Sequence, residues 1–350
     1  MAVSPLVLIR CDGTPEIGMG HVVRCLALAE ELKDAHGYEV RFLLRERSIG
    51  SLQITAHGFL VNHAPEDTLE AEWIDKQLKV QRPDVLIFDS RTGLGRDVVK
   101  CWQQSGLLVV SIDDPEEKRL AADLVFYPPV PQVERMNWQG FVGERHVGWD
   151  WVILRSQFSS YKLLNVTTNK SKADHIPQIL VTMGGSDPAG LTMLALEALE
   201  KIDQPFHATV LIGAGFCHTT TLNEWLKTAT KKYEVLLNVD DVAAIMAGSD
   251  LAIASFGMTA YELAAMGVPA LYVCLSEDHA ESAGVFTDAG IGISLGVSSR
   301  VTVEMLAGRI GGLLGDPYAR QKQSEVAKDT IDGLGAIRIA EKIASKGLKK

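Results

Sequence analysis

The sequence predicts an α/β protein with two Rossmann-like domains, each built on a doubly wound parallel sheet, that face each other across a cleft. Short apolar segments alternate with helical periods through both halves of the chain, which is typical of parallel sheets covered on both faces. A glycine-rich loop follows the first apolar segment of each half, at residues 18–21 and 184–187. The length of 350 residues also exceeds the size at which a single core usually stops growing.

The expected elements follow this alternation in order. In the first half, strands are predicted at residues 6–9, 40–44, 85–88, 107–112 and 124–127. In the second half, they are predicted at residues 179–183, 207–212, 233–237, 251–254 and 270–274. Residues 155–177 are rich in Ser, Thr, Asn and Lys, and are therefore the best linker candidate. We expect a first domain over residues 1–158, a second over 176–335 and a Lys-rich helical tail over 336–350.

Composition limits the class of partner. The net charge of −10 and the isoelectric point near 5.4 argue against a nucleic-acid surface, because binding a phosphate backbone needs concentrated positive charge. A nucleotide would instead be held locally, by loop N–H groups, helix ends or single arginines. The five cysteines lack C-x-x-C spacing and the nine histidines lack metal-binding spacing, so we expect reduced thiols and no metal or other cofactor. A serine-hydrolase elbow, G-x-S-x-G, is also missing.

The distribution of apolar residues gives no sign of export or membrane insertion. The N-terminal residues lack a basic stretch ahead of a long apolar run. The longest apolar stretch, residues 263–275, is interrupted by Gly267 and Pro269 and is shorter than a spanning helix. We expect a cytoplasmic protein without stable membrane association, and a monomeric state is compatible with the sequence.

The most informative stretch is residues 6–32, where an apolar segment, a glycine-rich loop and an amphipathic helix follow one another. Gly18 and Gly20 let the backbone turn sharply, and the helix that begins near His21 adds the positive end of its dipole. Such a corner attracts phosphate or another anion, and it favours the neutral imidazole that a general base requires. The alternative is that the glycines only shape the turn and that His21 only starts the helix.

The second half contains further glycine loops at predicted strand ends. Gly184, Gly185 and Ser186 follow a strand and precede a helix, for which Ser186 or Asp187 is the expected N-cap. Gly213 ends the next strand, where either close approach of a ligand or an ordinary turn explains a glycine. These loops are candidates for contacts with a phosphate group.

The segment 254–262 ends a strand in small residues and then begins a helix. Backbone N–H groups of Gly257, Met258 and Thr259, next to Ser255, could cradle a diphosphate. Glu262 lies about one turn further on and could accept hydrogen bonds from ribose hydroxyls. A capping box, Thr259-x-x-Glu262, explains the same pattern equally well.

Polar side chains follow several other predicted strands. They are Asp89 and Arg91, the pair at 113–114, and Asp278 with His279. Loops at the carboxyl ends of parallel strands line the ligand edge of such folds, so Asp89 or the pair at 113–114 could orient His21 or a sugar hydroxyl. Helix capping is the alternative, and we favour it for Asp114.

Several of these motifs together resemble a known family. They are Arg10-x-Asp12-Gly13, Gly18-x-Gly20-His21-x-x-Arg24-Cys25-Leu26-Ala27-Leu28-Ala29, Ile112-Asp113-Asp114, Leu154-Arg155-x-x-Phe158, Gly184-Gly185-Ser186-Asp187 and the helix through 259–262. The sequence is similar over most of its length to the UDP-2,4-diacetamido-2,4,6-trideoxy-β-L-altropyranose hydrolase of the pseudaminic acid pathway. The wider group includes spore-coat polysaccharide proteins.

The resemblance implies a glycosyltransferase-B type fold, with UDP held mainly by the C-terminal domain and the sugar facing the N-terminal loop. It implies that His21 activates water, with Asp12 nearby, and that Gly18, Gly20, Arg24, Asp89 and the glycine loops bind substrate. The implied reaction is a metal-independent hydrolysis of a UDP-linked 2,4-diacetamido-2,4,6-trideoxy hexose with inversion, which releases UDP and the free sugar. The loops at Gly184 and Gly257 would stabilise the leaving diphosphate.

Two positions depart from the family pattern. An Asn-Gln pair stands in those hydrolases where this chain has Asp278 and His279, and a tyrosine stands where it has Arg91. Both positions should face the sugar, so the resemblance predicts the class of reaction better than the N-acyl groups or the stereochemistry of the substrate. Two other functions remain open: an inverting glycosyltransferase that uses a UDP-sugar donor, and a non-catalytic protein that binds nucleotide sugars. No apolar or basic run for a membrane-linked acceptor stands out in the first half, which favours hydrolysis, and the sequence leaves open which carboxylate supports His21.

Overall fold

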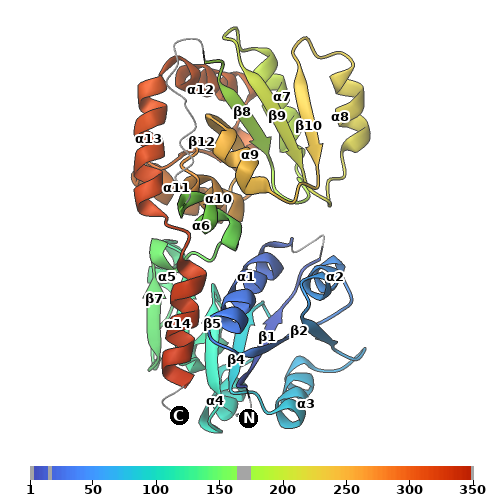
Figure 1. Cartoon of the computed structure of the whole chain (residues 1–350), viewed down its shortest axis with the longest axis vertical. Coiled ribbons are helices and arrows are strands. Elements are labelled where there is room, and N and C mark those ends of the chain that lie inside the picture. Colours follow the sequence, from blue (N-terminus) through green and yellow to red (C-terminus); the bar gives the residue numbers. More distant parts are fainter. Residues whose placement is uncertain (1–3, 15–17, 164–174, 348–350) are drawn as a thin grey trace. The chain divides into compact units, whose positions relative to one another are not determined.

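The structure, a computed structural model, describes residues 4–14, 18–163 and 175–347. It divides into two compact units (Figure 1). Unit 1 comprises Met1–Arg155 and Gly333–Lys350, and unit 2 comprises Ser156–Asp332. Unit 1 is therefore assembled from two separate stretches of sequence, with the whole of unit 2 inserted between them.

Unit 1 contains a seven-stranded parallel sheet with the order β3-β2-β1-β4-β5-β6-β7. The strands are β1 (Leu6–Cys11), β2 (Glu39–Leu44), β3 (Leu60–His63), β4 (Val85–Asp89), β5 (Leu108–Ile112), β6 (Leu124–Tyr127) and β7 (Glu144–Val147). After β3 the chain crosses to the other side of β1 and adds β4 there. The strand order thus reverses between β1 and β4, the point at which open α/β sheets bind ligands.

Helices cover both faces of this sheet. They are α1 (Gly20–Asp34), α2 (Ile49–Ala56), α3 (Glu70–Gln81), α4 (Arg96–Gln104), α5 (Gln132–Arg135) and α14 (Gly335–Gly347), with short 3-10 segments at Glu117–Ala121 and Trp149–Trp151. One face packs against α1, α2 and α14, whose buried residues include Leu26, Ile54 and Ile339. The other packs against α3 and α4 through Trp73 and Val99. Because β1 is buried along its whole length, its sequence reads as an unbroken apolar run up to Arg10.

Unit 2 repeats the architecture with a six-stranded parallel sheet in the order β10-β9-β8-β11-β12-β13. The strands are β8 (Gln178–Thr182), β9 (His207–Ile212), β10 (Tyr233–Leu237), β11 (Leu251–Ser255), β12 (Ala270–Cys274) and β13 (Ile293–Val297). Here the order reverses between β8 and β11. The glycine loops that follow these two strands therefore meet at the ligand edge of this sheet.

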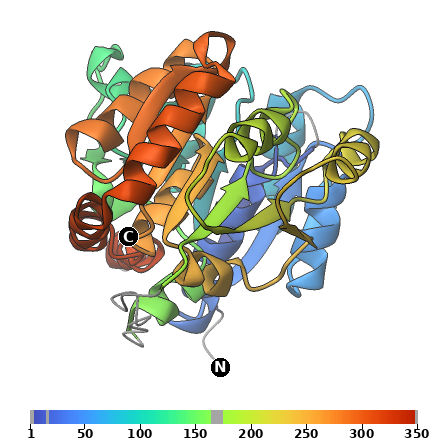
Figure 2. The same ribbon diagram turned by 90° about the horizontal axis from the view of Figure 1, so that it is seen from above.

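The helices of unit 2 also lie on both faces of their sheet (Figure 2). They are α6 (Ser156–Leu163), α7 (Leu191–Glu200), α8 (Thr219–Leu226), α9 (Val242–Gly248), α10 (Met258–Ala265), α11 (Glu277–Asp288), α12 (Val303–Gly315) and α13 (Pro317–Thr330), with a 3-10 segment at Ser298–Arg300. On one face, α7 and α12 enclose a core that includes Leu196 and Ile310. On the other, the rings of Phe256, Tyr272 and Phe286 pack edge to face.

The predicted fold class is confirmed, and each predicted strand is present within two residues of its expected ends. Strands β3, β7 and β13 were not predicted from the sequence. All three lie at sheet edges and are largely half-buried or exposed, so their sequences lack the continuous apolar run of a central strand.

The predicted linker and tail differ from the structure in part. Residues Ser156–Leu163 of the expected linker form α6, and its stretch 165–174 lies outside the described residues, as do residues 348–350 of the tail. The tail is helical as expected, but the idea of a separate tail is corrected, because Ile339, Ala340 and Ile343 of α14 are buried in the core of unit 1.

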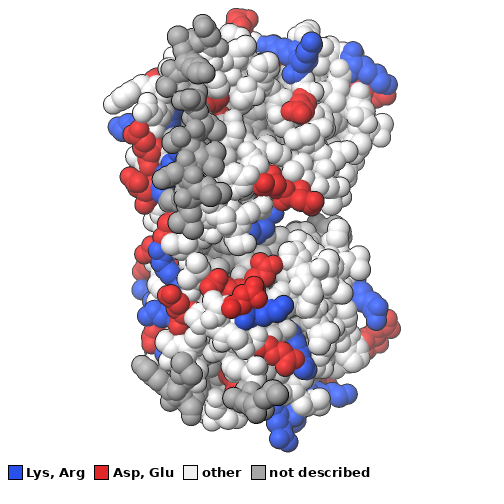
Figure 3. Space-filling model, viewed as in Figure 1, with Lys and Arg blue, Asp and Glu red and all other residues white. Residues whose placement is uncertain are grey.

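The surface carries charged side chains of both signs. On the face shown in Figure 3, the described Lys and Arg residues are scattered in small groups among Asp and Glu. They form no extended basic surface there. Among the described residues, no helix combines the length and the apolar character needed to cross a membrane.

Candidate active site

Unit 1 brings His21, Arg24 and Asp89 together where its strand order reverses. Asp89 is the last residue of β4, and its carboxylate accepts a hydrogen bond from Nδ1 of His21 over 2.7 Å. His21 and Arg24 lie one turn apart near the start of α1, so both side chains reach the same carboxylate. The sequence proposed these three residues separately, and the fold assembles them.

The glycine-rich loop sets the position of His21. Gly18 has a φ of +82°, a conformation that glycine adopts without strain, and its N–H donates to the carbonyl of Thr14 over 2.8 Å. Gly20 is the first residue of α1, and Met19 precedes it as an N-cap without a side-chain hydrogen bond. The tight turn therefore delivers His21 as the second residue of the helix, beside the end of β4.

Asp89 is fully buried and has several donors. Arg24 donates to it from Nε over 2.6 Å and from Nη2 over 2.5 Å, and the thiol of Cys25 contributes a third contact at 3.3 Å. Arg24, itself buried, also donates to Asp113 over 3.0 Å. Asp113 has a φ of +51° and sits at the end of β5. Arg24 thus links the ends of two neighbouring strands.

These contacts determine the charge of Asp89 and the tautomer of His21. Burial alone would raise the pKa of Asp89, but the charge of Arg24, followed by His21, holds that pKa well below its usual range. The ionised carboxylate can only accept, so Nδ1 of His21 must carry a hydrogen. In the neutral ring the lone pair is then on Nε2, and 29% of the His21 side chain is exposed. This geometry is that of a general base oriented by a buried carboxylate.

The structure corrects the expected role of Asp12. Its carboxylate forms an ion pair with Arg10 at 2.7 Å and accepts the backbone N–H of Arg45 over 2.8 Å. Asp89, not Asp12, is the carboxylate at Nδ1 of His21. The sequence could not decide between them, because both residues end strands that are neighbours in the sheet.

In unit 2, the glycine loops after β8 and β9 lie against each other. A Cβ added to Gly213 would lie 2.6 Å from the backbone of Gly185, and Gly215 donates its N–H to the carbonyl of Gly185 over 2.9 Å. Gly213 is therefore required by the close approach of the neighbouring loop. Gly184 has a φ of +76°, and its added Cβ would lie 3.7 Å from Oγ of Ser255, at the end of β11.

The first loop of unit 2 is anchored to the following helix. Ser186 is half-buried, whereas Asp187 is buried and accepts the N–H groups of Leu191 over 2.8 Å and Thr192 over 2.9 Å. Gly190 is the N-cap of α7, so neither Ser186 nor Asp187 occupies that position as predicted. Asp187 still caps the helix, from three residues further back.

The sequence left two interpretations of the first turn of α10, a capping box at Thr259 or a diphosphate site, and the structure tests the capping box. Gly257 is the N-cap, and no side chain caps the helix. Thr259 is then the second helical residue, after Met258, so the capping box Thr259-x-x-Glu262 is wrong. The backbone N–H groups in the first turn of α10 therefore donate to no capping side chain. Glu262 lies in the same helix and is buried.

Asp278 and His279 begin α11, after β12. Ser276 is the N-cap and accepts the N–H of His279 over 3.2 Å, so Asp278 stays exposed on the first turn. Burial lowers the pKa of His279, while Asp278 partly opposes this shift. The ring of His279 lies 6.4 Å from that of Phe256, between centroids.

A pocket on unit 1 is lined by two of the predicted residues, Asp12 and Arg91, and by one that was not predicted. Arg91 is exposed and lines a cavity of about 440 Å³ together with Arg45, which follows β2. The rule that strand ends carry ligand contacts would have identified Arg45, had it been applied to β2. Asp114 accepts the N–H of Glu116 over 2.9 Å, but Glu116 itself is the N-cap of the 3-10 segment Glu117–Ala121, which has no side-chain cap, so the capping role predicted for Asp114 is wrong. Within the described residues, no group of three His, Cys, Asp or Glu side chains is placed to hold a metal.

The two doubly wound units form a glycosyltransferase-B type fold. The structure of MurG from Acinetobacter baumannii has a TM-score of 0.72 over 98% of this chain and 100% of that one, with 15% identity. The structure of Staphylococcus aureus MnaA with UDP has a TM-score of 0.65 over 97% and 96% of the two chains, also with 15% identity. At this identity the likeness establishes the fold alone.

Proteins with similar sequences include one of polysaccharide biosynthesis and one sugar transferase. The chain is 26% identical to the spore coat polysaccharide biosynthesis protein SpsG of Bacillus subtilis over 95% of both chains. It is 32% identical to an uncharacterised protein of Methanocaldococcus jannaschii over 77% of its own length, and it spans 56% of that protein. It is 28% identical to a Corynebacterium efficiens UDP-N-acetylglucosamine–N-acetylmuramyl-(pentapeptide) pyrophosphoryl-undecaprenol N-acetylglucosamine transferase, over 48% of this chain and 46% of that one. No family model matches the chain.

Proposed function

We propose that this protein is an enzyme that binds a UDP-linked sugar and transfers the glycosyl group to a hydroxyl activated by His21. The observation that carries the proposal is the pairing of the partly exposed His21 ring with the buried, ionised Asp89. The similarity to SpsG and to the corynebacterial transferase supports sugar-nucleotide chemistry. The presence of UDP in the S. aureus structure of the same fold supports a uridine nucleotide.

The chemistry is a single displacement. Nε2 of His21 accepts the proton of the incoming hydroxyl while its oxygen attacks the anomeric carbon. The bond from that carbon to the diphosphate oxygen breaks, and UDP leaves with the electron pair. The sugar is therefore transferred with inversion. Asp89 stabilises the imidazolium that forms, and Arg24 keeps Asp89 ionised.

Unit 2 is assigned the nucleotide. The loop at Gly184 and Gly185 and the first turn of α10, from Gly257, present backbone N–H groups at the switch point of the sheet. These groups would stabilise the charge that develops on the leaving diphosphate. Glu262, one turn into α10, is the proposed acceptor for ribose hydroxyls.

The nucleophile distinguishes two candidates. Transfer to an acceptor is supported by the relatives named as transferases and by α2, where Ile49 and Leu52 are 44% and 72% exposed. These two apolar side chains lie three residues apart in α2. Hydrolysis is the second candidate. It is supported by the motifs from Arg10 to Ala29, which resemble those of sugar-nucleotide hydrolases acting on 2,4-diacetamido-2,4,6-trideoxy hexoses.

The test is UDP release from a panel of UDP-linked amino sugars, with and without added acceptor sugars, for wild type, His21→Ala and His57→Ala. His57 is an exposed histidine of the same unit, paired with Glu30, and is the matched control. We expect His21→Ala to lose roughly 10²- to 10⁴-fold in rate and to keep UDP affinity in calorimetry. His57→Ala should retain both.

Each outcome assigns a function. Release that requires an acceptor indicates a transferase, and release without one indicates a hydrolase. UDP binding without turnover of any donor would indicate a binding protein and refute the enzymatic proposal. Full activity in His21→Ala would refute the role of the base.

A further inference from the structure

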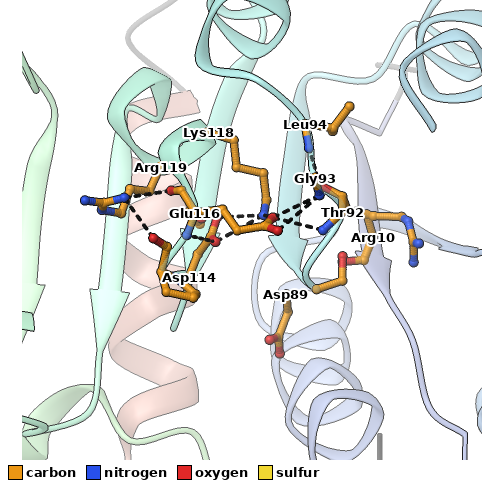
Figure 4. A network of polar contacts seen from close by, with 12 residues as sticks. Arg10, Asp89, Thr92, Gly93, Leu94, Asp114, Glu116, Lys118 and Arg119 are labelled. Carbon is orange, nitrogen blue, oxygen red and sulfur yellow. Dashed lines mark hydrogen bonds and ion pairs between the residues drawn. The ribbon is translucent and has the colours of Figure 1, made fainter. Parts of the chain in front are cut away.

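The polar pocket on unit 1 that is lined by Arg45 and Arg91 is not used by the chemistry of His21. Its volume is about 440 Å³, within the usual range for small-molecule sites, and six of its nine lining residues are charged. Arg10 lies at the end of β1, next to Cys11, and successive side chains of a strand point to opposite faces. Cys11 is paired in register with Asp89, and Figure 4 shows Asp89 and Arg10 pointing away from each other. The pocket and the His21 site are therefore separate.

Most charges in the pocket are already matched. Arg10 is 2% exposed and forms ion pairs with Asp12 at 2.7 Å and with Glu70 at 2.6 Å. Arg45 shares Glu70 at 3.5 Å and donates to the carbonyl of Thr68 over 2.6 Å. Two arginines and two carboxylates thus neutralise one another, and these contacts hold their side chains in place.

Arg91 is the positively charged lining residue that takes no part in these ion pairs. It is exposed, and among the described residues it has no hydrogen-bond or ion-pair partner. The other charged residue at the rim is Asp67, which is also exposed. An acidic group fits beside Arg91, whereas Asp67 suits hydroxyl donors and would repel a second negative charge.

Hydrogen bonds to Glu116 hold the backbone that directly follows Arg91. Glu116 accepts the N–H groups of Thr92 over 2.9 Å and of Gly93 over 3.1 Å, and the buried Lys118 contacts the same carboxylate (Figure 4). Thr92 itself lines the pocket. The loop is thus ordered before any ligand arrives, which lowers the entropic cost of binding.

We propose that this pocket binds a carbohydrate carrying one acidic group, a carboxylate or a phosphate, and that Arg91 recognises that group. The inference does not depend on turnover at His21, and its test measures binding alone.

The probes are glucuronate, glucose 6-phosphate, glucose and inorganic sulfate, titrated into the full chain and followed by NMR chemical shifts. The variants are Arg91→Gln, Arg91→Lys and the control Arg47→Gln, which removes an exposed charge of the same unit from outside the pocket lining. We expect an acidic sugar to bind 10- to 100-fold more tightly than glucose, as one charge-assisted contact would give. Arg91→Gln should abolish this preference, Arg91→Lys should keep part of it, and Arg47→Gln should leave it unchanged.

Whichever of glucuronate and glucose 6-phosphate binds more tightly shows whether the recognised group is a carboxylate or a phosphate. The inference is overturned if neither binds better than glucose, or if Arg91→Gln retains the preference. Sulfate that binds as tightly as both acidic sugars would show an anion site without a carbohydrate, and would overturn it too. Because Arg91 is exposed, its substitution leaves the core intact, and loss of UDP affinity in the same variant would instead bear on the proposed function.

Discussion

Replacing the buried Lys118 with Met is expected to destabilise unit 1 by about 3 kcal/mol. The side chain of Lys118 has no exposed surface, and its ammonium contacts Asp114 at 3.0 Å and Glu116 (Figure 4). Methionine has nearly the same length and fills the space of the aliphatic stem, while the ammonium, which also lies 5.9 Å from the centroid of the Phe88 ring, is lost. The change therefore removes the charge and little else.

The expected size of this loss in stability follows from the hydrogen bonds that Asp114 and Glu116 retain in the variant. Removing one partner of a buried ion pair usually costs about 3–5 kcal/mol, because the other charge is left uncompensated. Asp114 keeps hydrogen bonds from Oγ of Ser111 at 2.8 Å and from the N–H of Glu116 at 2.9 Å, and Glu116 keeps those of the loop after β4. The lower end of the range is therefore expected.

The loss should depend on pH with a definite sign. Burial raises the pKa of Asp114, although Lys118 opposes this shift, so without Lys118 the pKa should rise further. A carboxyl group whose pKa is raised in the folded state destabilises the fold in full above that pKa, and the destabilisation fades as the pH falls towards the unfolded pKa of about 3.9. The destabilisation should be full at pH 7.5 and smaller at pH 5.

Tryptophan fluorescence during urea unfolding is a suitable assay because it reports mainly on unit 1. Trp73, Trp102, Trp138, Trp149 and Trp151 belong to unit 1, and Trp225 belongs to unit 2. The control is Lys79→Met, which breaks an exposed pair with Asp75 and should cost less than about 1 kcal/mol. Adding Asp114→Asn to Lys118→Met should restore part of the stability. A loss below about 1 kcal/mol, or an equal loss at both pH values, would refute the reasoning.

Three further predictions concern positions with little freedom. Gly335→Ala places a Cβ 2.1 Å from the carbonyl oxygen of Val152, so it should displace α14 and lower the unfolding midpoint of unit 1 in the same fluorescence assay. Gly213→Ala forces the loop at Gly185 to move, and calorimetry should show UDP binding weakened roughly tenfold, equivalent to about 1.4 kcal/mol of strain; unchanged affinity would contradict it. Asp89 has a depressed pKa, so its contribution should persist above the unfolded value of about 3.9 and be lost below it. The stability difference between wild type and Asp89→Asn should therefore persist down to about pH 5 and shrink only under stronger acid.

The central strands could be predicted from the sequence because burial on both faces leaves a continuous apolar signal. The edge strands could not, since β7 reads Glu-Arg-His-Val and is half exposed to solvent. The fate of α14 was also hidden. Its alternation of lysines with Ile339 and Ile343 shows a helix with an apolar face, but no local pattern shows which unit that face covers.

The candidate site was predictable in type and less so in detail. The glycine loop and the start of α1 indicated His21, because strand, turn and helix are consecutive in the sequence. The supporting carboxylate depended on strand order. Asp12 is close to His21 in sequence, but Asp89 is the residue that the pairing of β1 with β4 brings to its ring.

The insertion of unit 2 within unit 1 has a consequence for synthesis of the chain. Ala336, Ile339, Ala340 and Ile343 complete a core whose other buried members lie before residue 155, so that core stays open until α14 has been made. Unit 2 lies in one continuous stretch, from Ser156 to Asp332, and has no such wait. Domains generally fold as units in the order of synthesis. Here the part begun first would be finished last, and the apolar face of α1 that α14 covers would stay open to chaperones throughout the synthesis of unit 2.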